Sequence, residues 1–348
     1  MGRKRITSHD VARLAGVSRS VVSAVLNATP GIGVSAETRE KVLAAIRELD
    51  YHVDAQARSM KTGRSMTLAA FGDTRHPLFI RLLEGMQRES EARGYHILLC
   101  SPGYRQSGEA RNELLDLYHQ RKIDGIVTLD STSYRSKEWA AKVQAAGVPY
   151  VSVEGYAETS GVSSVLADYK GSVTMALDYL LKRNPDMKGA PLYAEVYGAP
   201  AGRVIWAEKM RKAAYMEWCR KYNLSPKVSR HEEKEGQVNW LEWLEGVAQA
   251  GAGETLPPVL VNWSNAVPDL YRAAHSLGLP IGEELKIMAA DNMIQGHRLS
   301  LPALSCVEIP YVSMGEEAVR CVLGQIELER ELPEKVWLPA ILRPGESA

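Results

Sequence analysis

Apolar residues in the first fifty positions recur at helical spacing in three short stretches. Residues 7–14 and 19–27 form the first two, and Gly16 lies between them, where the backbone must turn sharply. Ser18 is placed to cap the second stretch, and Ser35 is placed to cap the third, which continues to position 49. Two short helices joined by a glycine turn, with a third helix after them, predict a helix-turn-helix domain. In this motif the second helix enters the major groove of DNA.

The first predicted helix shows both a start signal and an inward face. Asp10 follows Thr7 by three residues, where a carboxylate can bond the free N–H groups of a helix start. Val11 and Leu14 are spaced to lie on one side of this helix, so we expect both to face the other two helices.

From residue 66 onwards, short apolar runs alternate with amphipathic stretches. The runs typical of buried strands are 68–72, 96–100, 125–129, 149–153, 192–196, 259–261 and 287–289, and a last strand is expected near 337–342. The helices expected between and after them are 78–93, 110–120, 137–145, 172–181, 209–222, 240–250, 269–277 and 312–329. This alternation predicts α/β lobes with parallel sheets flanked by helices. The segment is too long for one sheet, so we expect two lobes with a ligand cleft at the carboxyl ends of the strands.

Charge separates the two parts of the chain. Residues 1–64 hold eleven basic and six acidic side chains, a net charge of +5, so the remainder carries −5 in a chain that is neutral overall. A basic head on an acidic body is expected of a protein that contacts phosphates through one end, and a chance fluctuation is the alternative. No run approaches the roughly 20 apolar residues of a membrane span. We therefore expect a cytoplasmic protein without a membrane partner.

Motifs for catalysis or metal binding are absent from the sequence. There is no HExxH, GxSxG or GxxxxGK, and the four cysteines lack CxxC spacing, so we expect reduced core thiols. The run HEEKE at 231–235 is expected to be a solvated surface turn rather than a metal site. We expect no enzymatic activity, no metal and no cofactor.

The sequence resembles the LacI/GalR family of bacterial transcription regulators. The segments DVARLAGVS, VSAVLN, VSAETREKVLAAIRELDY and AQARSM carry the resemblance within the first 64 residues, and PALSCVEIPYVSMGEEAV continues it in the body. The resemblance implies a helix-turn-helix head at 1–52, a hinge helix and linker at 53–65, and an effector-binding and dimerisation domain at 66–348. That domain would be a periplasmic-binding-protein-like pair of lobes joined by three chain crossings. The first lobe would take residues near 66–167 and 296–324, and the second lobe the rest.

The resemblance also implies which residues contact DNA. Arg19, Ser20 and Ala24 stand where the family reads base edges: Arg19 can pair with guanine, with a phosphate contact as its alternative, and Ala24 can touch a thymine methyl group. Met60 stands where an apolar side chain wedges into the minor groove, and an ordinary flexible linker is the alternative. The full set of expected DNA contacts is Thr7, Ser18, Arg19, Ser20, Val21, Ser23, Ala24, Asn27, Ala57, Arg58 and Met60.

An effector site in the cleft is implied in the same way. Its expected residues are Phe79, Arg211, Trp263, Ser264, Asn265 and Asp291. A paired arginine and aspartate suit a hydroxyl-rich or polar ligand, and Trp263 can stack on a sugar ring. For each of these residues, a structural role in the core of a lobe is the alternative.

Together these features predict a ligand-responsive, sequence-specific transcription regulator, a repressor that binds a palindromic operator in double-stranded DNA. It would act as a homodimer, joined through the first lobe and the helix after Tyr311, with a sugar or related small polar metabolite as effector. A transport-type binding protein and an enzyme on the same two-lobed scaffold are the rival classes. The helix-turn-helix and the missing signal peptide disfavour the first, and the missing catalytic motifs disfavour the second.

Overall fold

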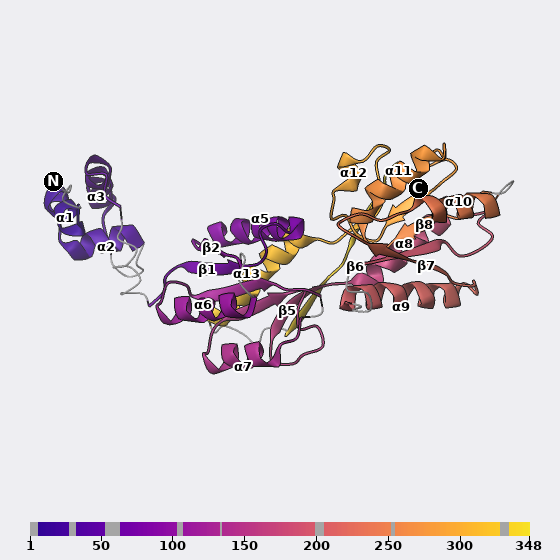
Figure 1. The fold of residues 1–348 in the computed structure, drawn as a ribbon. Helices are drawn as coiled ribbons and strands as arrows, with labels where there is room; N and C mark the ends of the chain where they lie inside the picture. Colours follow the sequence, from indigo (N-terminus) through magenta and orange to yellow (C-terminus); the bar gives the residue numbers. More distant parts are fainter. Residues whose placement is uncertain are drawn as a thin grey trace. The chain divides into compact units, whose positions relative to one another are not determined.

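The computed structural model describes residues 6–27, 33–52, 63–102, 107–132, 134–198, 205–251, 255–327 and 334–348. The chain divides into two compact units, Met1–Ser65 and Met66–Ala348 (Figure 1). The expected hinge residues Ala57, Arg58 and Met60 lie outside the described residues.

The first unit is the predicted set of three helices, α1 (Ser8–Ala15), α2 (Arg19–Asn27) and α3 (Ala36–Glu48). The start of α1 is held as expected, because the Thr7 backbone N–H and hydroxyl both donate to the Asp10 carboxylate, at 3.0 and 2.7 Å. Gly16 ends α1 in the left-handed region, at φ 69°, which confirms the predicted turn. The Ser35 hydroxyl caps α3 by accepting from the Thr38 N–H at 3.2 Å.

A small core holds this unit together. Its buried residues are Val11, Ala12, Val22, Val25, Val42 and Ala45. The prediction that Leu14 faces inward is wrong, because its side chain is 46% exposed. The inner side of α1 follows Val11 and Ala15, one turn apart, and at 3.6 residues per turn Leu14 is rotated by about 100° from Ala15.

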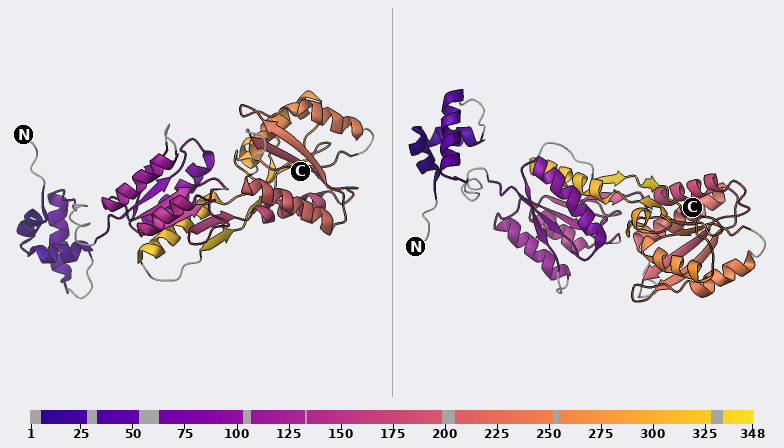
Figure 2. Two further views of the ribbon diagram at one scale, coloured as in Figure 1. Left: turned by 60° about the horizontal axis from the view of Figure 1, so that its bottom comes forward. Right: turned by 90° about the horizontal axis from the view of Figure 1, so that it is seen from above.

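The first lobe of the second unit is a parallel sheet of six strands in the order β11-β5-β4-β3-β1-β2. The strands are β1 (Thr67–Phe71), β2 (His96–Cys100), β3 (Gly125–Leu129), β4 (Tyr150–Val153), β5 (Ser163–Ala167) and β11 (Lys335–Leu338). Helices α5 (Pro77–Ala92) and α13 (Tyr311–Glu327) cover one face, and α6 (Ser107–His119) and α7 (Lys137–Ala145) the other (Figure 2). Gly85 and Gly315 let α5 and α13 touch, since a Cβ at either position would lie within 2.2 Å of a backbone oxygen on the other helix.

The second lobe has the sheet order β12-β10-β9-β8-β6-β7, parallel except for the antiparallel pair β10–β12. Its strands are β6 (Leu192–Gly198), β7 (Lys227–Glu233), β8 (Val259–Val261), β9 (Ile287–Ala289), β10 (Ser305–Glu308) and β12 (Ile341–Arg343). Helices α8 (Tyr169–Arg183) and α9 (Trp206–Lys221) cover one face, and α10 (Leu241–Ala250) and α11 (Val267–Ser276) the other. A short helix, α12 (Gly296–Leu299), precedes β10.

The chain passes between the lobes after β5, after β10 and after β11, which confirms the three expected crossings. Two of the expected lobe limits are wrong. Residues 296–308 belong to the second lobe, because β10 pairs with β9, and β11 belongs to the first lobe, because it pairs with β5. The single strand expected near 337–342 is therefore two strands, one in each sheet.

The surface turn expected at 231–235 is also wrong for its first three residues, because β7 continues to Glu233. His231 lies in β7 and is buried, with its ring centroid 4.1 Å from that of Trp240 and 4.9 Å from that of Trp243. Burial lowers the pKa of this histidine to about 4. All four cysteines are free thiols, and three of them are buried.

Candidate functional site

The start of α2 in the first unit presents exposed polar side chains to a binding partner. Arg19 and Ser20 are exposed there, and the Ser18 and Ser20 hydroxyls bond each other at 2.7 Å. The Ser18 hydroxyl also accepts from the Val21 N–H at 3.4 Å. Thr7, at the start of α1, is exposed as well. These positions offer a cation and several hydroxyl groups to an incoming partner.

Other expected DNA contacts are less available. Ala24 is only 4% exposed, so the prediction that its methyl group reaches a base edge is wrong for this conformation. Its side chain ends at Cβ and does not extend past its neighbours, and it shares the buried side of α2 with Val22 and Val25. Val21 and Ser23 are half-buried. The side chain of Asn27 lies outside the described residues.

In the second unit, side chains from both lobes enclose a small cavity. They are Leu78, Arg81, Tyr169, Arg211, Trp263, Asp291, Asn292, Met293, Ile309 and Tyr311. The space left among them is about 10 Å³, close to the roughly 10–15 Å³ that one water molecule needs. Side chains or lobes must therefore move to admit anything larger than water. Three of the six expected effector residues, Arg211, Trp263 and Asp291, line this cavity.

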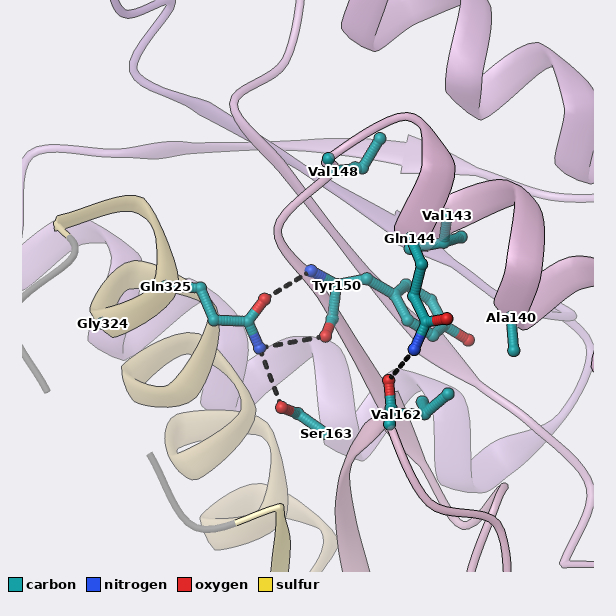
Figure 3. A pocket seen from close by; sticks show the side chains of 11 residues that line it. Ala140, Val143, Gln144, Val148, Tyr150, Val162, Ser163, Gly324 and Gln325 are labelled. Carbon is teal, nitrogen blue, oxygen red and sulfur yellow. Dashed lines mark hydrogen bonds between the residues drawn. The ribbon is translucent and has the colours of Figure 1, made fainter. Parts of the chain in front are cut away.

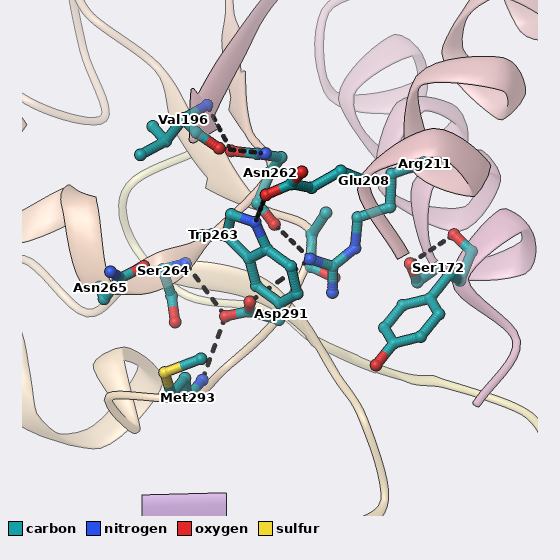
Figure 4. A network of polar contacts seen from close by, with 12 residues as sticks. Ser172, Val196, Glu208, Arg211, Asn262, Trp263, Ser264, Asn265, Asp291 and Met293 are labelled. Atoms are coloured by element: carbon teal, nitrogen blue, oxygen red, sulfur yellow. Dashed lines mark hydrogen bonds and ion pairs between the residues drawn. The ribbon is translucent and has the colours of Figure 1, made fainter. Parts of the chain in front are cut away.

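Arg211 is the centre of the polar network at the cavity (Figure 4). It is fully buried on α9, and its guanidinium donates to the Asn262 carbonyl at 2.7 Å and to the Ala290 carbonyl at 3.3 Å. The guanidinium carbon lies 4.0 Å from the ring centroid of Trp263 and 4.7 Å from that of Tyr169. These contacts hold the guanidinium between two aromatic rings.

Asp291 accepts hydrogen bonds through one oxygen only. Its Oδ1 accepts from the backbone N–H of Ser264 at 3.0 Å and from that of Met293 at 3.1 Å. Its Oδ2 is buried without a hydrogen bond and lies 3.6 Å from Arg211 Nη1. The side-chain oxygen of Asn292 is likewise buried without a partner. The cavity wall thus carries acceptors that a ligand with O–H or N–H donors can satisfy.

The remaining expected effector residues lie off the cavity wall. Phe79 is fully buried in the first lobe, where its ring lies so close to Gly72 that a Cβ there would come within 2.6 Å of it. The neighbouring Leu78 lines the cavity instead. Ser264 holds Asp291 through its backbone N–H. Asn265 is directed to β7, where its amide donates to Glu233 at 2.7 Å.

Two tyrosines on the wall were missed by the sequence analysis. Tyr169 and Tyr311 come directly after two of the three crossings, so the chain carries them past the cavity. The Tyr169 hydroxyl donates to Glu154, a buried acid that also accepts from the Ala167 N–H at 3.2 Å. Burial raises the pKa of Glu154 to about 7. A tyrosine following a crossing is a signal that could have identified both positions.

A larger cavity of about 470 Å³ in the first lobe has its polar groups paired within the chain (Figure 3). The Gln325 side chain accepts from the Tyr150 N–H at 2.7 Å and donates to the Tyr150 carbonyl at 3.1 Å and to the Ser163 hydroxyl at 3.0 Å. The Gln144 amide donates to the Gly161 carbonyl at 2.8 Å. This cavity is therefore a weaker ligand candidate than the one between the lobes.

The described part of the chain offers neither a metal site nor a membrane span. Within it, no three or more His, Cys, Asp or Glu side chains are grouped to hold a metal ion. None of its helices is both long enough and apolar enough to span a membrane.

Comparison with known proteins bears on both units. A family model described as bacterial regulatory proteins, lacI family, matches residues 7–54, and a periplasmic binding protein-like domain matches residues 197–348. The chain is 26% identical over 333 residues to the HTH-type transcriptional repressor PurR of Pectobacterium carotovorum, which covers 93% of this chain and 92% of the relative. It is also 26% identical over 348 residues to the ribose operon repressor of Escherichia coli K12, covering 98% and 99%.

Solved structures agree on the fold. The Lac repressor dimer bound to operator and the anti-inducer ONPF matches with a TM-score of 0.72 at 20% identity, covering 99% of each chain. The complex of the transcriptional regulator CelR with cellobiose matches with a TM-score of 0.62 at 22% identity, covering 99% of this chain and 100% of that one. A helix-turn-helix head followed by a two-lobed body, and relatives that match along more than nine-tenths of the chain, lead to one conclusion. The chain belongs to the LacI family of bacterial transcription regulators.

Proposed function

We propose that this regulator is a repressor that binds a palindromic operator as a homodimer and responds to a small polar ligand in the cavity between its lobes. The observation that carries the ligand part is the buried Oδ2 of Asp291, an acceptor without a hydrogen bond on the cavity wall. Because the target is DNA in a bacterium, we place the protein in the cytoplasm.

For DNA, we propose that Arg19 and Ser20 read base edges in the major groove. Both are exposed on the first turn of α2, and a bidentate arginine–guanine pair contributes about 1–3 kcal/mol of discrimination. We propose further that Met60 wedges into the minor groove at the centre of the operator, with Ala57 and Arg58 beside it. The relative determined as a complex with operator, the Lac repressor, supports this class of target.

For the ligand, we propose a sugar or a related hydroxyl-rich metabolite. Hydroxyl groups donate to Asp291 Oδ2 and to the Asn292 side-chain oxygen, and the Trp263 ring offers a flat apolar face to a sugar. With room for only one water, binding requires a change in the lobes or in the cavity wall, so it can be coupled to DNA binding. Such coupling is reciprocal, since operator and ligand must change each other's affinity by the same factor.

For the homodimer, the exposed apolar residues include two in the first lobe, where the contact is expected, and two in the second lobe. The apolar side of α13 is buried within its own lobe, so an apolar contact with a partner needs other residues. Leu98 and Leu99 are exposed on the edge strand β2. Leu299 at the end of α12 and Leu301 just beyond it are 74% and 90% exposed. We propose that these residues form the dimer contact, because large exposed apolar side chains favour association.

The experiment that tests the DNA function is selection of bound duplexes from a random pool by the purified full chain. We expect an enriched site with two-fold symmetry and binding that weakens steeply with salt. Arg19→Ala should lower affinity and relax the preference at one base pair in each half-site. Arg93→Ala, which removes an exposed arginine of the second unit, is the matched control and should leave the enriched site unchanged.

The hinge variant Met60→Gly is selected in parallel and should weaken the site without changing its outer base pairs. Absence of enrichment, with and without added cell-extract metabolites, would contradict the repressor proposal. It would leave a small-molecule binding protein of the transport type as the better account of the two-lobed body.

A further inference from the structure

Arg81 on α5 of the first lobe bonds directly to the second lobe. Its guanidinium donates to Glu308 Oε1 at 2.9 Å, and the two side chains are only 21% and 11% exposed. Glu308 is the last residue of β10, immediately before the chain crosses to α13. A half-buried ion pair therefore joins α5 to the end of the strand that leads into a crossing.

A second arginine holds Glu308 from its own side. Arg343 of β12 donates from Nε to Glu308 Oε2 at 2.7 Å. Since β12 and β10 pair in the same sheet, this contact lies within the second lobe. The carboxylate is thus held by one arginine from each lobe, and only the bond to Arg81 must break when the lobes move apart.

Arg81 also lines the cavity, from the first lobe, whereas Asp291 and Asn292 line it from the second. Whatever enters the cavity must fit beside this guanidinium or displace it. A change in cavity occupancy can therefore strengthen or release the bond between the lobes. Arg81 was not predicted as a site residue, because a cation in the second turn of an amphipathic helix ordinarily faces solvent.

We propose that Arg81 is a positioning residue for the ligand response. Through its bond to Glu308, Arg81 sets the balance between closed and open lobes. Its role in the response rests on the proposed function, whereas its effect on the lobes does not. The test therefore measures lobe separation in the full chain without DNA or ligand. One spin label is placed on a noncanonical residue at exposed Lys142 of the first lobe and another at exposed Glu242 of the second, and their separation is measured by double electron–electron resonance.

We expect Arg81→Ala to raise the ratio of open to closed lobes about five- to thirty-fold, the factor that corresponds to the loss of one or two kcal/mol. Arg81→Lys should restore part of the closed population, since it keeps a cation but not the fork of donors. Arg343→Ala is the matched control, because it removes the other partner of the same carboxylate without touching the bond between the lobes. It should leave the distance distribution unchanged.

An unchanged distribution in Arg81→Ala would overturn the proposal, and so would an equal shift in Arg81→Ala and Arg343→Ala. Circular dichroism and the urea midpoint establish that each variant is folded. If Arg81→Ala does not fold, Glu308→Gln is compared with Arg343→Ala in its place, because the neutral amide weakens both bonds of the carboxylate and the control removes only the bond to Arg343. Failure of operator selection would contradict the repressor function and leave this measurement unaffected.

Discussion

Each lobe of the second unit buries an arginine beside an aspartate and surrounds it with aromatic rings. The first lobe holds Arg111 with Asp130, and the second holds Arg211 with Asp291, all at most 6% exposed. Only the second pair lines the cavity between the lobes. The two sites have the same charges and similar burial, so neither feature alone marks a ligand site.

In the first lobe the carboxylate is fully engaged by the chain. Asp130 Oδ1 accepts from Arg111, and its Oδ2 accepts from the hydroxyls of Thr128 and Ser152 at 2.7 Å each and from that of Tyr150 at 3.3 Å. In the second lobe, one oxygen of Asp291 accepts from backbone N–H groups, and the other makes no hydrogen bond. The difference between a structural pair and a candidate ligand site is therefore the acceptor that is left over.

Asp130→Ala should have the largest effect on stability. It leaves Arg111 as an uncompensated cation among the rings of Phe71, Tyr134 and Trp139, and breaking a buried pair in this way costs about 3–5 kcal/mol. Urea unfolding followed by circular dichroism measures the loss. Lys142→Ala, which removes one partner of an exposed pair in the same lobe, should change the free energy of unfolding by less than about 1 kcal/mol. A loss of that small size for Asp130→Ala would show that the pair is not structural.

Glu154, which joins the first lobe to Tyr169, should make stability depend on pH. Its pKa is raised from 4.5 to about 7 in the folded chain by burial. Between these values the unfolded chain releases the proton while the folded chain keeps it, so the free energy of unfolding falls as pH rises from about 4.5 to 7. The stabilisation is complete below pH 4.5 and fully lost above 7, with a total change of roughly 3 kcal/mol at 1.36 kcal/mol per unit.

Urea midpoints of the wild type and Glu154→Gln, taken at matched pH values, measure this contribution. The variant cannot ionise at this position, so the difference between the two proteins should grow across this pH range. A difference that stays constant with pH would contradict the assignment to Glu154.

Asp291→Asn should lower the free energy of unfolding less than Asp130→Ala does. It should, however, abolish the response to the ligand. The amide oxygen can still accept from the two backbone N–H groups, and Arg211 keeps its bonds to the Asn262 and Ala290 carbonyls. We therefore expect a loss of about 1–2 kcal/mol, within the range for a hydrogen bond to a charged group that becomes neutral. Its NH₂ group then takes the place of the spare acceptor and no longer accepts from a ligand. With the duplex recovered by selection, the variant should bind DNA normally and fail to respond to the metabolite that changes wild-type binding. A normal response would remove Asp291 from the ligand site.

The sequence was sufficient to predict the main strands and the family. It did not predict features that depend on contacts between segments far apart in the chain. Strands 96–100 and 125–129 are apolar and were predicted to the residue, whereas the polar edge strand β7 looked like a surface turn. Phe79 was assigned to the cavity in place of Leu78 because neighbouring residues on a helix point about 100° apart, and a resemblance does not resolve that angle. Arg111 gave no signal at all, since a cation in an amphipathic helix is ordinarily solvated. Burial by rings from three other segments is visible only in the fold.

Two matched serines provide the finest test of the comparison between the lobes. Ser152 and Ser264 are both fully buried, but only the hydroxyl of Ser152 donates to its lobe's aspartate, at 2.7 Å. The hydroxyl of Ser264 instead accepts a long bond of 3.4 Å from the Ile294 N–H, and Asp291 is held by the Ser264 backbone. Ser152→Ala should therefore cost about 1.5–3 kcal/mol and Ser264→Ala about 0.5–1 kcal/mol, the ranges for charged and neutral hydrogen bonds. Equal losses in urea unfolding would mean that the Ser264 hydroxyl donates to Asp291 as that of Ser152 donates to Asp130, which would remove the spare acceptor on which the ligand proposal depends.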